Sequence, residues 1–205
     1  MIDQTGPAPS LALRADLTGA TPDDLPVLPP LAFAGGTIDL GADVSASGYS
    51  PAALLATASG EIHARLHDTA LAGVDLPQLT RLLAARAPGL RPALTAAMGA
   101  GNTGPLSGDI SASLQQGAAT LPRAHVAGGA GSLAIEGSID LPGRTSDLAL
   151  QVAPAVTDPP ALGLRLVGPW QGGKRVADVR PALLWAGVGP AKKARGSAPG
   201  PRRGQ

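Results

Sequence analysis

Most of this chain alternates apolar and polar residues with a period of two, which is typical of β-strands that bury one face. In the stretch GSLAIEGSIDL, for example, Leu133, Ile135 and Ile139 alternate with small or charged residues. The same pattern predicts a succession of strands along the chain, over residues 10–18, 36–49, 60–73, 106–117, 117–129, 131–141, 144–154 and 161–170.

The period changes to the helical one in four short places. Ser50 precedes Pro51 and an alanine- and leucine-rich run, which predicts a capped helix over residues 50–57. Asp75, with Pro77 just inside, predicts the start of a second helix, which Pro88-Gly89 ends. We therefore expect helices over the segments 50–57, 76–87, 90–98 and 179–185.

Short turns such as Pro142-Gly143 join successive strands, so neighbours in sequence should pair as an antiparallel meander. The sequence thus predicts a mainly β fold: an open curved sheet with one apolar face, plus two to four short helices. A closed barrel could bury that face, a second sheet could cover it, or it could hold an apolar ligand. We expect the strand over residues 161–170 to be the terminal edge of the sheet, with Gly168-Pro169 preventing further pairing. Four residues should then fold back over the open end of the apolar face: Val179, Leu183, Leu184 and Trp185.

Composition supports this architecture and narrows the chemistry. The 205 residues include 28 glycines and 21 prolines, yet 44% are hydrophobic and only 15% charged, the reverse of a disordered chain. We therefore read the glycines and prolines as turns between many strands. There is no cysteine, which excludes disulfides and thiolate chemistry, and we expect no cofactor.

Charge is distributed unevenly. The chain carries a net charge of +1, but its last fifteen residues contain five basic and no acidic side chains. We expect residues 187–205, which include these fifteen, to be a disordered basic tail, with binding to nucleic acid or anionic lipid as the less favoured alternative. No apolar run reaches transmembrane length, and the N-terminus has no signal-peptide pattern.

Candidate catalytic and metal sites are weak. His63 and His67 are four residues apart, but on a strand that spacing spans about 13 Å, too far for one metal ion. Asp75, Asp140 and Asp147 recur beside turns, where aspartate usually caps the backbone. The loop GAGNTG lacks the lysine of a phosphate-binding loop. We therefore expect no catalytic residues and no metal site.

The strongest candidate site is an apolar stripe along the later strands. It is either an ordinary core face or the floor of a lipid groove, and both roles are compatible. Its members are Leu133, Ile135, Ile139, Leu148, Leu150, Val152, Leu164 and Leu166.

Three phrases of the sequence occur in an order that resembles the AsmA-type proteins of Gram-negative bacteria. The first is a strand and turn that lead into a helix, with Gly60, Gly73, Val74, Asp75 and Leu76. The second is a meander phrase with Gly137, Ile139, Asp140, Leu141, Arg144, Thr145, Asp147 and Leu148. The third closes the chain, with Gly168, Pro169, Trp170, Asp178, Val179, Leu183 and Leu184.

The resemblance covers roughly residues 36–186 and implies an envelope protein of the inner membrane and periplasm that binds lipid along a β-sheet groove. It divides the chain into an irregular lead-in with one strand (1–35), an AsmA-like C-terminal β domain (36–186) with a helical insert near 76–98, and the tail. Family members carry an N-terminal membrane anchor, so the chain resembles only their C-terminal portion.

Two functional hypotheses follow. The first is a non-enzymatic periplasmic module that binds or guides phospholipid acyl chains along its apolar face. The alternative is a scaffold without its own ligand, whose partner is the remainder of a larger AsmA-like chain or another envelope protein. An enzyme is the least favoured class, and no nucleic-acid partner is expected.

Overall fold

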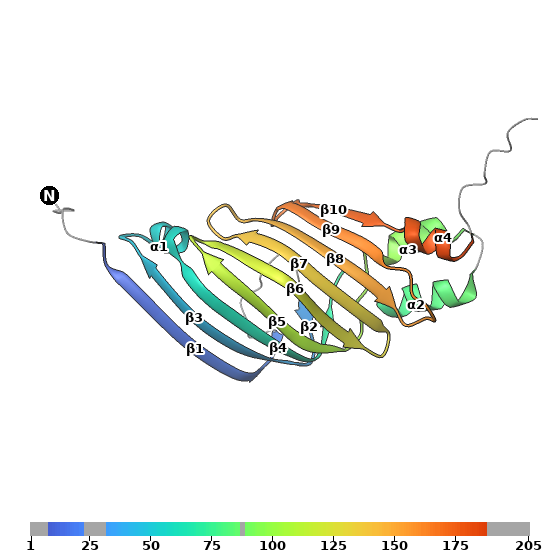
Figure 1. Ribbon diagram of the computed structural model, residues 1–205, viewed down its shortest axis with the longest axis horizontal. Coiled ribbons are helices and arrows are strands. Elements are labelled where there is room, and N and C mark those ends of the chain that lie inside the picture. The colour runs from blue at the N-terminus through green and yellow to red at the C-terminus, as the bar shows by residue number, and fades with distance from the viewer. Residues whose placement is uncertain (1–7, 23–31, 87–88, 188–205) are drawn as a thin grey trace, which may run out of the picture.

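A computed structural model describes residues 8–22, 32–86 and 89–187 of the protein. Ten strands of this part of the chain form one antiparallel sheet that does not close into a barrel (Figure 1). The strand order is β1-β3-β4-β5-β6-β7-β8-β9-β10, and β2 pairs with β4 beside this path. The predicted fold class, a mainly β open meander with a few short helices, is confirmed.

The elements lie close to the positions that the sequence predicts. The strands are β1 Ser10–Ala20, β2 Phe33–Ala34, β3 Thr37–Ser47, β4 Ser59–Leu71, β5 Leu106–Gln115, β6 Ala118–Gly128, β7 Gly131–Asp140, β8 Thr145–Pro154, β9 Leu162–Pro169 and β10 Lys174–Asp178. The helices are α1 Pro51–Thr57, α2 Leu76–Ala85, α3 Leu90–Ala97 and α4 Arg180–Trp185.

The helix starts have the expected local cause. The Ser50 hydroxyl accepts a hydrogen bond from the Ala53 amide at 3.2 Å, and an Asp75 carboxylate oxygen accepts one from the Gln78 amide at 2.8 Å. Each bond satisfies an amide that the first helical turn leaves without a partner. In α2, Leu76, Leu79 and Leu83 then fall on one buried face.

Cross-strand register keeps the apolar residues on one face of the whole sheet. Leu13 of β1 lies opposite Val44 of β3, Ile135 of β7 opposite Leu150 of β8, and Leu148 of β8 opposite Leu166 of β9. Directly opposed residues in an antiparallel pair share a face. The sheet therefore has one continuous apolar face, from β1 to β9.

Irregular registers bend several strands and curl the sheet toward its apolar side. The ladders shift between Leu17 and Ala20 in β1, between Leu66 and Thr69 in β4, and between Leu121 and Ala124 in β6. Such bulges increase the local twist and bend of a strand. The curl brings β10 to the segment after β4, where the Arg175 guanidinium donates to the Gly73 carbonyl at 2.8 Å.

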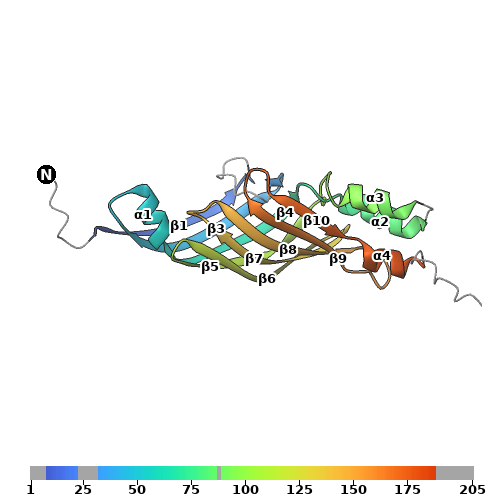
Figure 2. The ribbon, with the colours of Figure 1, turned by 90° about the horizontal axis from the view of Figure 1, so that it is seen from above.

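The main core lies on this face at the end of the sheet where α2, α3 and α4 gather, whereas α1 lies at the opposite end (Figures 1 and 2). α2 contacts α3, β7 and β8, and α4 contacts β9. A smaller cluster of Ala58, Leu114 and Ala119 lies after α1, which itself buries no residue.

Four details differ from the sequence analysis. β10 and the two-residue β2 are not predicted as strands. β9 is not the edge of the sheet, because β10 pairs with it from Lys174 to Asp178. Gly168 and Pro169 do not pair with β10, whose ladder ends at Val167, although Pro169 lies in register with Thr145 of β8. Leu184, expected to fold over the apolar face, is 67% exposed, whereas Val179 and Leu183 are buried there as expected.

The lead-in (1–35), expected to hold one strand, contains β1 and the two-residue β2. The strand expected in the lead-in is β1, which pairs with β3 as part of the same sheet. The basic tail from residue 188 onward lies outside the described residues.

Candidate functional site

The eight residues of the predicted stripe share one face, as expected, but the structure encloses them. Seven have exposed fractions between 0% and 4%, and Ile139 is half-buried. They pack in one core cluster with the buried leucines of α2 and α3. A ligand would reach them only if the covering elements moved away, so the accessible part of the face lies elsewhere.

That accessible part is at the β1 side of the sheet. Leu11, Leu13 and Leu17 of β1 are 56%, 55% and 45% exposed, although their alternation matches that of the buried strands. They continue across the sheet into half-buried apolar residues of β3, β4 and β5. We call this set the uncovered apolar surface: Leu11, Leu13, Leu17, Leu40, Val44, Ile62, Ala64, Ile110 and Ala112.

Helix contacts explain why this region stays open. Within the described residues, the principal contacts of α2 and α4 with the sheet fall on β7, β8 and β9. α1 contacts β3, and its Thr57 hydroxyl donates to the Ser47 carbonyl at 2.6 Å. α1 therefore sits at the terminal end of β3 and does not extend along β1.

The opposite face of the same strands is polar and carries ion pairs between neighbouring strands. Arg14 pairs with Asp43 at 2.7 Å, and Arg65 pairs with Asp109 at 2.7 Å. These side chains are mostly exposed, so each pair contributes little to stability. The Asp109 carboxylate raises the pKa of Arg65 by accepting its hydrogen bond.

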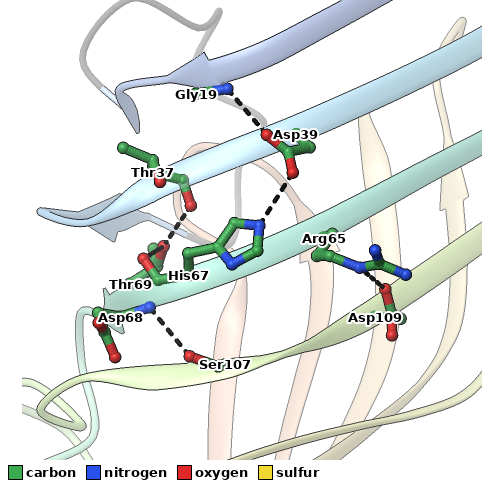
Figure 3. A network of polar contacts seen from close by, with 9 residues as sticks. All are labelled: Gly19, Thr37, Asp39, Arg65, His67, Asp68, Thr69, Ser107 and Asp109. Carbon is green, nitrogen blue, oxygen red and sulfur yellow. Dashed lines mark hydrogen bonds and ion pairs between the residues drawn. The ribbon is translucent and has the colours of Figure 1, made fainter.

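Asp39 is the centre of the polar network shown in Figure 3. One carboxylate oxygen accepts the Gly19 amide at 2.8 Å, and the other lies 2.9 Å from His67 Nε2. The Gly19 amide, followed by the His67 side chain, lowers the pKa of Asp39. Gly19 sits in the β1 bulge with φ of 67°, so this contact holds the irregular end of β1 against β3.

The histidines and aspartates considered as candidate sites lie on the surface or beside turns. His63 and His67 are exposed on the polar face, and His63 Nδ1 lies 3.1 Å from the Ser111 hydroxyl. Asp140 accepts the Gly143 amide of the following turn at 3.3 Å. Asp147 differs from the turn-capping expectation, because it forms a two-bond ion pair with Arg165 that lowers the pKa of Asp147.

Two open hollows lie on the surface of the described residues. One, of about 480 Å³, lies beside Gly41 and is lined by polar side chains that include Asp16, Asp39 and Asp109. The other, of about 780 Å³, lies between the end of α2, the loop after β8 and α4. At its rim the Arg86 guanidinium lies 4.8 Å from the centre of the Trp185 ring. His63 and Ser111 both line the hollow beside Gly41, with their side chains 3.1 Å apart, and both are exposed on the polar face of the sheet.

The fold and its surface together define an open antiparallel β-meander with one apolar face, enclosed at one end and uncovered at the other. Comparisons of the chain with protein-family models, with curated proteins and with solved structures find no match. In the part of the chain that the structure describes, no helix is both long enough and apolar enough to cross a membrane.

Proposed function

We propose that this chain is a non-enzymatic lipid-binding β module, and that acyl chains lie on the uncovered apolar surface. The observation that carries the proposal is the 45–56% exposure of Leu11, Leu13 and Leu17 on the same face that forms the core elsewhere. Contiguous exposed apolar residues on a folded surface commonly mark a binding site. The eight stripe residues then form the closed floor beside the site and are not contacts of the lipid.

The expected binding is weak and reversible. Removing apolar surface from water contributes about 25 cal/mol per Å², or about 0.8 kcal/mol for each CH₂ group that becomes buried. A single acyl chain on an open face remains partly hydrated, because one side of it has no protein cover. Such affinity suits a surface that guides lipid along its length better than one that stores it.

The charged side chains of these strands lie away from the uncovered apolar surface. Arg14, Arg65, Asp43 and Asp109 neutralise one another in pairs on the far face from the leucines. A lipid head group would remain in water beside the strand ends. By its resemblance to AsmA-type proteins, the module would act on the periplasmic side of the inner membrane in envelope biogenesis, with phospholipid as its partner.

The test compares two adjacent positions on opposite faces of β1. Leu13→Asp places a charge on the uncovered apolar surface, whereas Ala12→Asp places the same charge on the polar face opposite Ser45. With a fluorescent fatty acid as probe, we expect Leu13→Asp to weaken binding roughly tenfold or more, because burying one leucine side chain contributes a free energy of about that size. Ala12→Asp should bind like the unmodified chain.

Thermal unfolding checks that both variants are folded. Equal weakening by the two substitutions would show that the leucine face is not the binding surface. No binding by the unmodified, folded chain would overturn the lipid proposal.

The scaffold hypothesis retains one specific observation in its favour, the enclosure of the predicted stripe beneath the helices. In that case the module is an assembly unit for the remainder of a larger AsmA-like chain, and the uncovered surface is an interface. The same titration separates the two functions, because a scaffold would leave the fatty acid unbound at every concentration below its micelle-forming limit.

A further inference from the structure

The two edges of the sheet are built differently. β10 is five residues long, begins with Lys174 and Arg175, and ends beside α4, which are features that protect an edge from pairing. β1 is eleven residues long and carries three exposed leucines. No strand of the described residues pairs with its outer side. β1 therefore presents an open row of backbone donors and acceptors.

The order of residues along β1 makes this edge complementary to itself. If two copies of β1 run antiparallel about a twofold axis at Ala15, Arg14 of each copy lies opposite Asp16 of the other. Leu13 of each copy then lies opposite Leu17 of the other. Opposite charges meet on the polar face and leucines meet on the apolar face, so both types of cross-strand pair are favourable.

We propose that the β1 edge binds the β1 edge of a second copy of this chain in this register. A pairing that uses the same patch on both partners forms a closed dimer and leaves no free β1 edge. The inference does not depend on lipid binding. In the dimer, however, the two uncovered apolar surfaces adjoin across the twofold axis.

Alternative registers lack this match. An axis at Arg14 places two arginines opposite each other, and an axis at Leu13 leaves Arg14 opposite Ala12. A shift by one residue turns the leucines of one copy toward the polar face of the other. The bulge after Leu17 ends the regular ladder, which confines pairing to the segment centred on Ala15.

The charges of the two residues are available for this contact. Asp16 is exposed and forms no ion pair with another described residue; Arg14 of the same strand pairs with Asp43 instead. Arg14 binds Asp43 through one terminal nitrogen at 2.7 Å, and 78% of its side chain remains exposed. Its other donors can therefore reach a carboxylate on a second copy.

The interface is a short strand pair, smaller than a standard protein interface, so we expect a weak dimer with Kd on the order of 100 µM. Sedimentation at protein concentrations up to about 1 mM should show reversible dimerisation on that scale. A chain that stays monomeric throughout would overturn the proposal, and so would association that continues beyond a dimer.

Disulfide trapping tests the register, because the chain contains no natural cysteine. Ala15→Cys places two thiols opposite each other at the axis, within the Cα separation that a disulfide allows. Leu11→Cys is the matched control, since the two Leu11 positions would lie about 26 Å apart along the strands. We expect rapid dimer formation by Ala15→Cys and little by Leu11→Cys. Equal cross-linking of the two variants would overturn the register.

Charge exchange tests the pairing of Arg14 with Asp16. In the Ala15→Cys chain, Asp16→Arg makes both positions positive and Arg14→Asp makes both negative. Each variant alone should cross-link roughly tenfold more slowly, because like charges then face each other. Mixed in equal amounts, they should give mainly the heterodimer. A mixture that cross-links no faster than the separate variants would contradict the proposed contact.

Discussion

β8 and β1 have nearly the same local pattern and opposite environments. Leu148, Leu150 and Val152 of β8 are at most 1% exposed, whereas the leucines of β1 are about half exposed. Both strands alternate apolar and polar residues and lie in one sheet. The difference arises from α2, which contacts β8 and does not extend to β1. Alternation therefore identifies a face of a strand, but a separate element decides whether that face is core or surface.

The largest difference should come from truncating one leucine to alanine in β8 and one in β1. Leu150→Ala leaves a cavity in the core and should lower the free energy of unfolding by about 2–5 kcal/mol. Leu13→Ala removes the same atoms from an open surface and should change it by about 0.5 kcal/mol or less. Denaturant unfolding measures both, and similar losses would mean that β1 is covered.

A medium effect should come from removing the two helix caps. Asp75→Ala and Ser50→Ala each delete one side-chain hydrogen bond to the first turn of a helix. Asp75→Ala should lower the free energy of unfolding by about 1 kcal/mol. Ser50→Ala should cost less, because α1 buries no residue whereas α2 buries three leucines. If Ser50→Ala proved the more damaging change in denaturant unfolding, α1 would have a packing role.

The smallest effect concerns pH, at the α4 end of the sheet. The Arg180 side chain, followed by its backbone amide, lowers the pKa of Asp178 from 3.8 to about 2. A carboxylate with a lowered folded-state pKa stabilises the protein above its unfolded pKa. This contribution is present above pH 3.8 and is lost as the pH falls toward about 2.

Asp178→Asn should therefore reduce the acid-induced loss of stability in that window, measured as the denaturant midpoint between pH 5 and pH 2. The pair is largely exposed, so the change should be small. Asp39 at the β1 end provides the matched comparison, since the Gly19 amide and His67 lower the pKa of Asp39 in the same direction. An identical pH profile for the Asp178→Asn variant and the unmodified chain would contradict the stabilising role of the ion pair.

Local signals predicted most of the elements correctly because each is encoded within a few residues. Asp75 and Pro77 mark the start of α2, and alternating leucines mark β8 and β9. β10 escaped prediction because KRVAD has no alternating apolar face, and it joins the sheet through its backbone register with β9. Leu184 was misplaced because a six-residue helix has too few turns to define its buried side from sequence.

The sequence by itself determined the strands, the capped helices and the existence of one apolar face, since these depend on periods of two and 3.6 residues and on neighbouring side chains. Only the tertiary structure decided which part of that face is closed. The closure depends on contacts between distant segments, such as Arg175 with Gly73 across 102 residues, and Thr80 with Ala130 across 50. No local pattern specifies such contacts, because they depend on how strongly the bulged strands bend the sheet and on which strands the helices pack against.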